Sequence, residues 1–175
     1  MHTLSKTLLA LTPALIALGS AAPAAAQSAS GDASVTIIRP ATITKNTNMV
    51  FGTIIRPTSG NGTVALSAAA TTARSVTGDV VALASTTPSA AKFTIVGEGG
   101  QSMSVSVPAT FALNPTSGAA LTVTTSNNIG SGVTLSNALG SEGSFVLYVG
   151  GSLPVTATTP TGDYTGSFTV TASYN

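Results

Sequence analysis

Apolar and hydroxyl-bearing residues alternate along many short segments of this chain. Met-Ser-Val-Ser-Val at 103–107 alternates with Ser, and Leu-Thr-Val-Thr at 121–124 alternates with Thr. A period of two places one set of side chains on a buried face and the other in solvent, and Val and Thr favour extended backbone. The pattern therefore predicts β-strands with one buried face. Strands are predicted at 33–38, 41–45, 48–55, 62–67, 79–84, 93–95, 103–107, 121–124, 132–136, 144–149 and 163–174.

Gly and Pro separate these segments. Gly-Glu-Gly-Gly at 97–100, Asn-Pro at 114–115 and Thr-Pro-Thr-Gly at 159–162 each indicate a turn. Strands that recur at intervals of about 8–12 residues with turn signals between them are typical of antiparallel sandwiches. We therefore expect an all-β, antiparallel, immunoglobulin-like β-sandwich of about 8–10 short strands over residues 41–175. A short helical turn is expected only at 68–74 and 89–92.

The first 26 residues have the pattern of a cleaved signal peptide. A weakly basic start with Lys6 precedes an apolar stretch from Leu8 to Leu18, and Ala24 and Ala26 fit a small-residue cleavage site before Gln27. The apolar stretch is far shorter than the ~20 residues that a membrane-spanning helix needs. We therefore expect an exported protein, located in the periplasm, at the cell surface or outside the cell, with no transmembrane helix in the mature chain.

The composition after residue 26 excludes most chemistry. His2 is the only His, the chain has no Cys, and the residues after 26 carry five basic and five acidic groups. Nucleic-acid binding is not expected without a basic surplus, and neither catalytic residues, cofactors nor a metal are expected, so the protein is predicted not to be an enzyme. The carboxylates lie mostly beside Gly, which indicates solvated acids in turns; a loop Ca²⁺ site is the alternative. They are Asp32, Asp79, Glu98, Glu142 and Asp163.

The C-terminal segment shows the clearest alternation. From Gly162 to Tyr174 all the large apolar residues occupy even positions, and the odd positions hold Asp163, Thr and Ser. This predicts one long strand at 163–174 with a buried face. Tyr164 is also expected to act as a corner tyrosine, whose hydroxyl binds backbone a few residues upstream.

A second apolar row precedes the domain. In 28–38 the odd positions are Ala29, Gly31, Ala33, Val35 and Ile37, and Arg39-Pro40 follows. Two interpretations stay open for residues 27–40. They are either the first strand of the domain, paired within the same chain, or an extension that adds a strand to another chain.

Ile-Ile-Arg-Pro occurs twice, at 37–40 and at 54–57. Pro lacks the donor for the next ladder bond, so each copy reads as a strand end. A duplicated binding loop is the alternative.

The C-terminal segment resembles that of chaperone–usher pilin subunits. Tyr174 is next to last, and Gly162 is the fourteenth residue from the end. The mature chain is also similar to a family of secreted proteobacterial β-sandwich domains of unknown function, related to spore-coat protein U domains. Segments 41–45, 50–54, 93–98 and 162–166 carry that similarity. Many such relatives carry a disulfide, which this chain cannot form.

The resemblance implies assembly by strand donation, with the chain itself and a periplasmic chaperone as partners. The donor residues would be Ala33, Val35 and Ile37, and the receiving strand would contribute Gly162, Tyr164, Phe168, Val170 and Tyr174. The expected function is an exported, non-enzymatic structural or adhesive subunit. The alternative is a monomeric extracytoplasmic binding module, for example for carbohydrate; an exposed Tyr148 beside other aromatics would favour it, and burial would favour the structural subunit.

Overall fold

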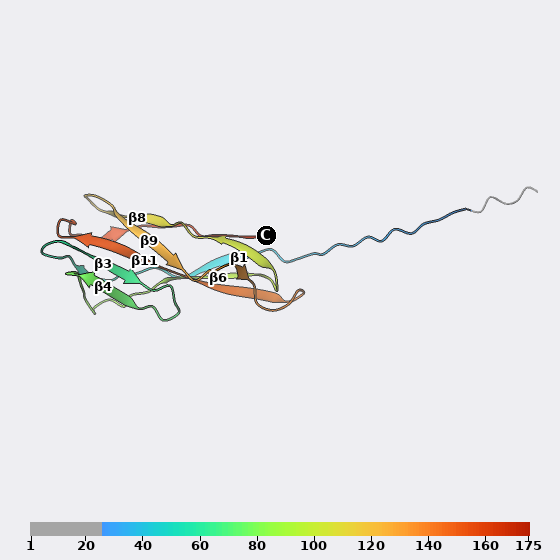
Figure 1. Cartoon of the computed structure of the whole chain (residues 1–175), viewed down its shortest axis with the longest axis horizontal. Helices are drawn as coiled ribbons and strands as arrows, with labels where there is room; N and C mark the ends of the chain where they lie inside the picture. The colour runs from blue at the N-terminus through green and yellow to red at the C-terminus, as the bar shows by residue number, and fades with distance from the viewer. Residues whose placement is uncertain (1–25) are drawn as a thin grey trace, which may run out of the picture. The chain divides into compact units, whose positions relative to one another are not determined.

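The computed structural model describes residues 26–175 (Figure 1). The predicted signal peptide, apart from its last residue, lies outside the described residues. The chain divides into two compact units with the boundary between Val35 and Thr36. The described residues of the first unit form no strand and are exposed. All the strands found in residues 26–175 belong to the second unit.

Residues 36–175 form an all-β domain, as the sequence predicts. Antiparallel strands make up all of its regular secondary structure, and no helix in the described residues is long and apolar enough to cross a bilayer. The strands are β1 (Thr42–Thr47), β2 (Ile54–Ile55), β3 (Asn61–Leu66), β4 (Arg74–Gly78), β5 (Val81–Ala82), β6 (Ala91–Glu98), β7 (Ser102–Ser106), β8 (Thr110–Pro115), β9 (Leu121–Asn127), β10 (Val133–Thr134), β11 (Glu142–Thr156), β12 (Tyr164–Thr165) and β13 (Thr171–Tyr174).

The long strand β11 organises the larger sheet. Its first half pairs with β6, its second half pairs with β3, and β9 pairs with its middle. The eight-stranded sheet follows the order β1-β6-β11-β9-β8-β12, with β3 and β4 added beside β11. A three-stranded sheet, β10-β7-β13, forms the second layer, and β2 pairs with β5 separately.

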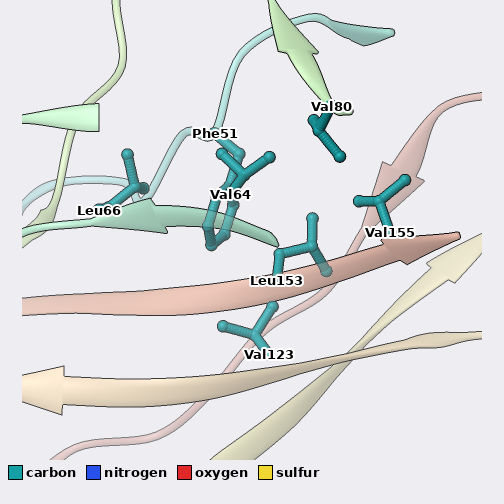
Figure 2. Close-up of a cluster of buried hydrophobic side chains, with 7 residues drawn as sticks. All are labelled: Phe51, Val64, Leu66, Val80, Val123, Leu153 and Val155. Carbon is teal, nitrogen blue, oxygen red and sulfur yellow. The ribbon is translucent and has the colours of Figure 1, made fainter. Parts of the chain in front are cut away.

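Alternating residues of the two layers form the core. Ile95 of β6 and Leu147 of β11 are fully buried, and they belong to clusters that include Met103 of β7 and Val170 before β13. A third cluster joins β3, β9 and the second half of β11 to Phe51 and Val80 (Figure 2). The fold is thus held by backbone pairing within each sheet and by burial of side chains between the layers.

The C-terminal segment is not one continuous strand, so the prediction of a long strand at 163–174 is wrong in extent. β12 pairs with β8 and β13 pairs with β7. Continuing the β12 register would bring Thr171 opposite Pro108, but Thr171 lies opposite Ser106. Pro108 has no N–H for a ladder bond, and it lies in the gap between β7, which ends at Ser106, and β8, which begins at Thr110. The alternation itself is confirmed: the side chains of the even residues from Phe168 to Tyr174 are buried or half-buried, whereas the odd residues are exposed.

Other strand predictions differ in detail. Segments 48–55, 79–84 and 132–136 contain only the two-residue strands β2, β5 and β10, and 33–38 contains none. The expected helical turn at 68–74 overlaps the start of β4. β8 was not predicted because Asn114-Pro115 reads as a turn, yet both residues pair with β12. Proline is tolerated there because it ends the strand.

Candidate assembly site

Tyr174 joins the C-terminal end of the domain to its start. Its hydroxyl accepts a hydrogen bond from the backbone N–H of Glu98 at 2.7 Å and donates one to the backbone oxygen of Arg39 at 2.9 Å. The side chain is half-buried on β13, next to the end of β6. One hydroxyl therefore satisfies two backbone groups that are distant in sequence.

Glu98 completes this contact from the side of β6. Only 3% of Glu98 is exposed, and its carboxylate accepts hydrogen bonds from the backbone N–H of Arg39 at 3.3 Å and from that of Gly140. The Arg39 guanidinium lies 3.6 Å from the same carboxylate and donates to the Gly140 oxygen at 3.1 Å. We call Arg39, Glu98 and Tyr174 the Arg39 clamp. The expectation that Glu98 is a solvated loop acid is wrong, because the Gly-rich loop around it turns its carboxylate inward onto backbone donors.

Gly97 makes room for the clamp. A methyl group at this position would meet the Tyr174 hydroxyl and lie 3.0 Å from Leu135. The close approach of the Tyr174 ring to β6 therefore depends on the absence of a side chain at residue 97.

Two strands beside the clamp have a free edge. Within the described residues β1 pairs only with β6, and β13 pairs only with β7. β1 and β13 lie close together, one from each layer. We call this pair of edges the β1–β13 edge. Ile43 lies opposite the fully buried Ile95 and so points toward the core, yet it is 38% exposed. The core is incompletely covered at this edge.

The predicted donor residues lie in a segment without secondary structure. Ala33 is exposed, Val35 is 83% exposed and Ile37 is 86% exposed. Neither of the large apolar side chains is buried within the single chain. Residues 27–40 form no strand in the described part of the chain.

The predicted receiving residues separate into different environments. Gly162 lies in an exposed turn with a positive φ, and the Tyr164 hydroxyl donates to the Pro160 oxygen at 2.8 Å, as expected of a corner tyrosine. The Phe168 ring packs at 6.0 Å from that of Phe93 and at 4.9 Å from that of Phe111. Val170 is buried. Of this set, Val170 and Tyr174 adjoin the β1–β13 edge most closely, since β13 begins at Thr171.

The two Ile-Ile-Arg-Pro motifs are alike in the hydrogen bonding of their arginines and differ in strand pairing. Each arginine donates to a distant backbone oxygen, Arg39 to Gly140 and Arg56 to Thr159 at 2.6 Å. Ile54-Ile55 forms β2, which pairs with β5, whereas Ile37-Ile38 is unpaired. The second copy also lines a shallow hollow of about 500 Å³.

Tyr148 is the residue whose exposure beside other aromatics would favour a carbohydrate-binding module. Tyr148 is half-buried, and its backbone N–H is held by the Asn128 side chain at 2.8 Å. The ring–ring contacts found in residues 26–175 all involve Phe168, so Tyr148 has no aromatic partner there. No cluster of three or more potential metal ligands occurs in that part of the chain either.

The fold and the site together define an all-β, antiparallel, two-layered domain that follows an unpaired segment with apolar alternation. The chain belongs to a family described as "Domain of unknown function (DUF4402)", which matches residues 41–174. The match begins directly after Arg39-Pro40. No curated protein and no solved structure matches the chain significantly.

Proposed function

We propose that this chain is an exported, non-enzymatic structural subunit that forms homopolymers by β-strand donation. Residues 28–38 of one copy are the donor, and the β1–β13 edge of the next copy is the receiver. The observation that carries the proposal is the exposure of Val35 and Ile37 at 83% and 86%, in a segment that has strand alternation but no partner.

The receiving edge supports the proposal through its unpaired backbone and uncovered core. An added strand would pair with free N–H and C=O groups, and its alternate side chains would cover the core near Ile43. Burying Val35 and Ile37 would contribute roughly 1.5–3 kcal/mol each. A periplasmic chaperone would protect the same edge before assembly, because free edges invite unspecific pairing.

Charge also favours this pairing. Lys45 is the only charged residue of β1, and it lies opposite Phe93, so its stem points to the core-facing side of the edge. An inward-pointing charge is a known protection of edge strands against random pairing. The only charge in 28–38 is Asp32, which is opposite in sign to Lys45.

The test uses the mature chain from Gln27 onward. Purified protein is expected to form filaments in negative-stain microscopy and ladders on a denaturing gel run without heating. Val35→Asp with Ile37→Asp is expected to abolish both, because two charges would enter the apolar side of the added strand. The matched control is Ser34→Asp with Thr36→Asp, which places the same charges on the solvent side.

Single particles at all concentrations of the unsubstituted chain would overturn the proposal, and would leave a monomeric binding module as the remaining interpretation. Equal loss of assembly in both pairs of variants would show that charge, and not the apolar row, is responsible.

A further inference from the structure

We infer that Arg39 and Pro40 direct the extension to a second copy by preventing it from folding back onto its own β1. This inference rests on the proposed function and adds the residues that decide between the two pairings. Folding back would require a hairpin whose loop lies between Ile38 and β1, which begins at Thr42.

The alternation of side chains limits which hairpin registers would bury Val35 and Ile37. A two-residue loop at 39–40 would place Val35 opposite Thr44 and Ile37 opposite Thr42, on the outer face of β1. Directly opposed residues of an antiparallel pair point to the same side, and Ile43, opposite Ile95, marks the core side. Among the loops that fit between Ile38 and Thr42, only the three-residue loop at 39–41 brings Ile37 opposite Ile43 and buries the apolar row.

Pro40 and Ala41 are unsuited to that three-residue loop. Such loops commonly combine a type I turn with a final residue in the left-handed region. Pro40 would occupy the second central position of the turn, where proline is disfavoured, and Ala41 would need a positive φ. In residues 26–175 Asn137 is the only residue other than glycine with a positive φ, so Ala41 does not adopt it. A five-residue loop at 38–42 keeps that register, but it takes Thr42 out of its pairing with Val96 in β1, and a seven-residue loop would consume Ile37 itself.

The Arg39 clamp adds a second obstacle. The backbone N–H of Arg39 is bound by Glu98, its backbone oxygen is bound by Tyr174, and its guanidinium is bound by the Gly140 oxygen. Reversing the chain at residues 39–41 would change the backbone dihedral angles there and break these contacts. The clamp therefore holds residue 39 in a conformation that does not lead into a hairpin.

The second Ile-Ile-Arg-Pro motif, at 54–57, is also not paired with the strand that follows it in sequence. Ile54-Ile55 precedes Arg56-Pro57, and the next strand in sequence is β3. β2 does not pair with β3; it pairs with β5, which lies further along the chain. At both places, therefore, Arg-Pro separates an Ile-Ile segment from the strand that follows it, and only the first copy lacks a partner in the described residues.

The test converts residues 39–41 into a loop that permits the hairpin. In the mature chain from Gln27, Pro40→Asp with Ala41→Gly supplies a turn former and a glycine for the left-handed position. We expect this double variant to be a monomer, with filament yield reduced at least tenfold and a higher melting temperature, and with slowed amide exchange at residues 33–38. Ala41→Gly alone is the matched control and is expected to polymerise, because Pro40 is retained.

The results distinguish this inference from the proposed function. If the double variant keeps a cooperative melting transition and still forms filaments like the unsubstituted chain, Arg39 and Pro40 do not direct the pairing, although strand donation stands. If the unsubstituted chain forms no filaments, the proposed function fails and this inference fails with it. A monomeric double variant whose residues 33–38 exchange freely would also overturn the inference, since the extension would then not be paired in the same chain.

Discussion

The hydroxyl of Tyr174 lies 2.9 Å from the backbone oxygen of Arg39, although 135 residues separate them. The same hydroxyl receives the N–H of Glu98, so the last strand, the end of β6 and the entry to the domain meet at one atom. Removing this oxygen would unlink three segments without changing the ring, which packs against the core cluster that contains Ile95.

Tyr174→Phe is accordingly expected to destabilise the domain by about 1–3 kcal/mol, because it leaves a partly buried N–H and a carbonyl without partners. Denaturant unfolding followed by far-ultraviolet circular dichroism measures the change. Tyr164→Phe removes a single bond, to Pro160, and should cost less. Equal stability of Tyr174→Phe and the unsubstituted chain would show that the two hydrogen bonds of the Tyr174 hydroxyl contribute nothing measurable.

Glu98→Ala is expected to cost more than Arg39→Ala. The carboxylate is buried and serves two backbone N–H groups, whereas the Arg39 side chain is about half exposed. Removal of a buried acceptor leaves its donors unsatisfied, at about 1–3 kcal/mol, while an exposed ion pair contributes about 0–1 kcal/mol. Comparing the unfolding free energies of the two single variants and the double variant gives their coupling. A larger loss for Arg39→Ala would contradict this assignment of roles.

Gly97→Ala tests the space that the clamp needs. The added methyl group would displace the Tyr174 hydroxyl and press on Leu135, so a loss of about 1–3 kcal/mol is expected from overpacking. Gly132→Ala is the matched control, because nothing lies within 4 Å of a methyl group there. Melting temperatures of the two variants that coincide would show that the domain relaxes around residue 97 at no cost.

The alternation of residues was sufficient to predict the fold class. Val-Ser and Leu-Thr alternation marks which side of β7 and β9 is buried, and this information is local. The length of each strand, by contrast, depends on partner strands that are distant in the sequence. Phe168 continues the alternation of the tail, yet it lies in no strand, because the tail changes partner from β8 to β7 between Thr165 and Thr171.

The clamp could not be predicted for a related reason. Glu98 stands in a glycine-rich segment, which ordinarily indicates a solvated acid, and only the distant Arg39 and Gly140 make its burial tolerable. Tyr174 was expected to face the core, but its hydroxyl partners depend on how β13 and β6 are placed by their neighbours. The repeated Arg-Pro is the one local feature of the sequence that is related to the clamp, since both arginines donate to distant backbone oxygens.

Ile95 and Ile43 form one rung of the β1–β6 ladder, but they differ in burial. Ile95 is fully buried, and Ile95→Ala is expected to cost about 2–5 kcal/mol through lost burial and a cavity. Ile43 is 38% exposed, so Ile43→Ala should cost clearly less in the isolated domain.

Donor addition would cover Ile43, and in filaments the same substitution should therefore lower the dissociation temperature by more than it lowers the melting temperature of the monomer. Unfolding of a chain lacking residues 27–38 gives the melting temperature of the monomer, and heating of filaments gives their dissociation temperature. If Ile43→Ala affected both states equally, an added strand would not lie over this part of the core, and the receiving edge would have to be sought elsewhere on the domain.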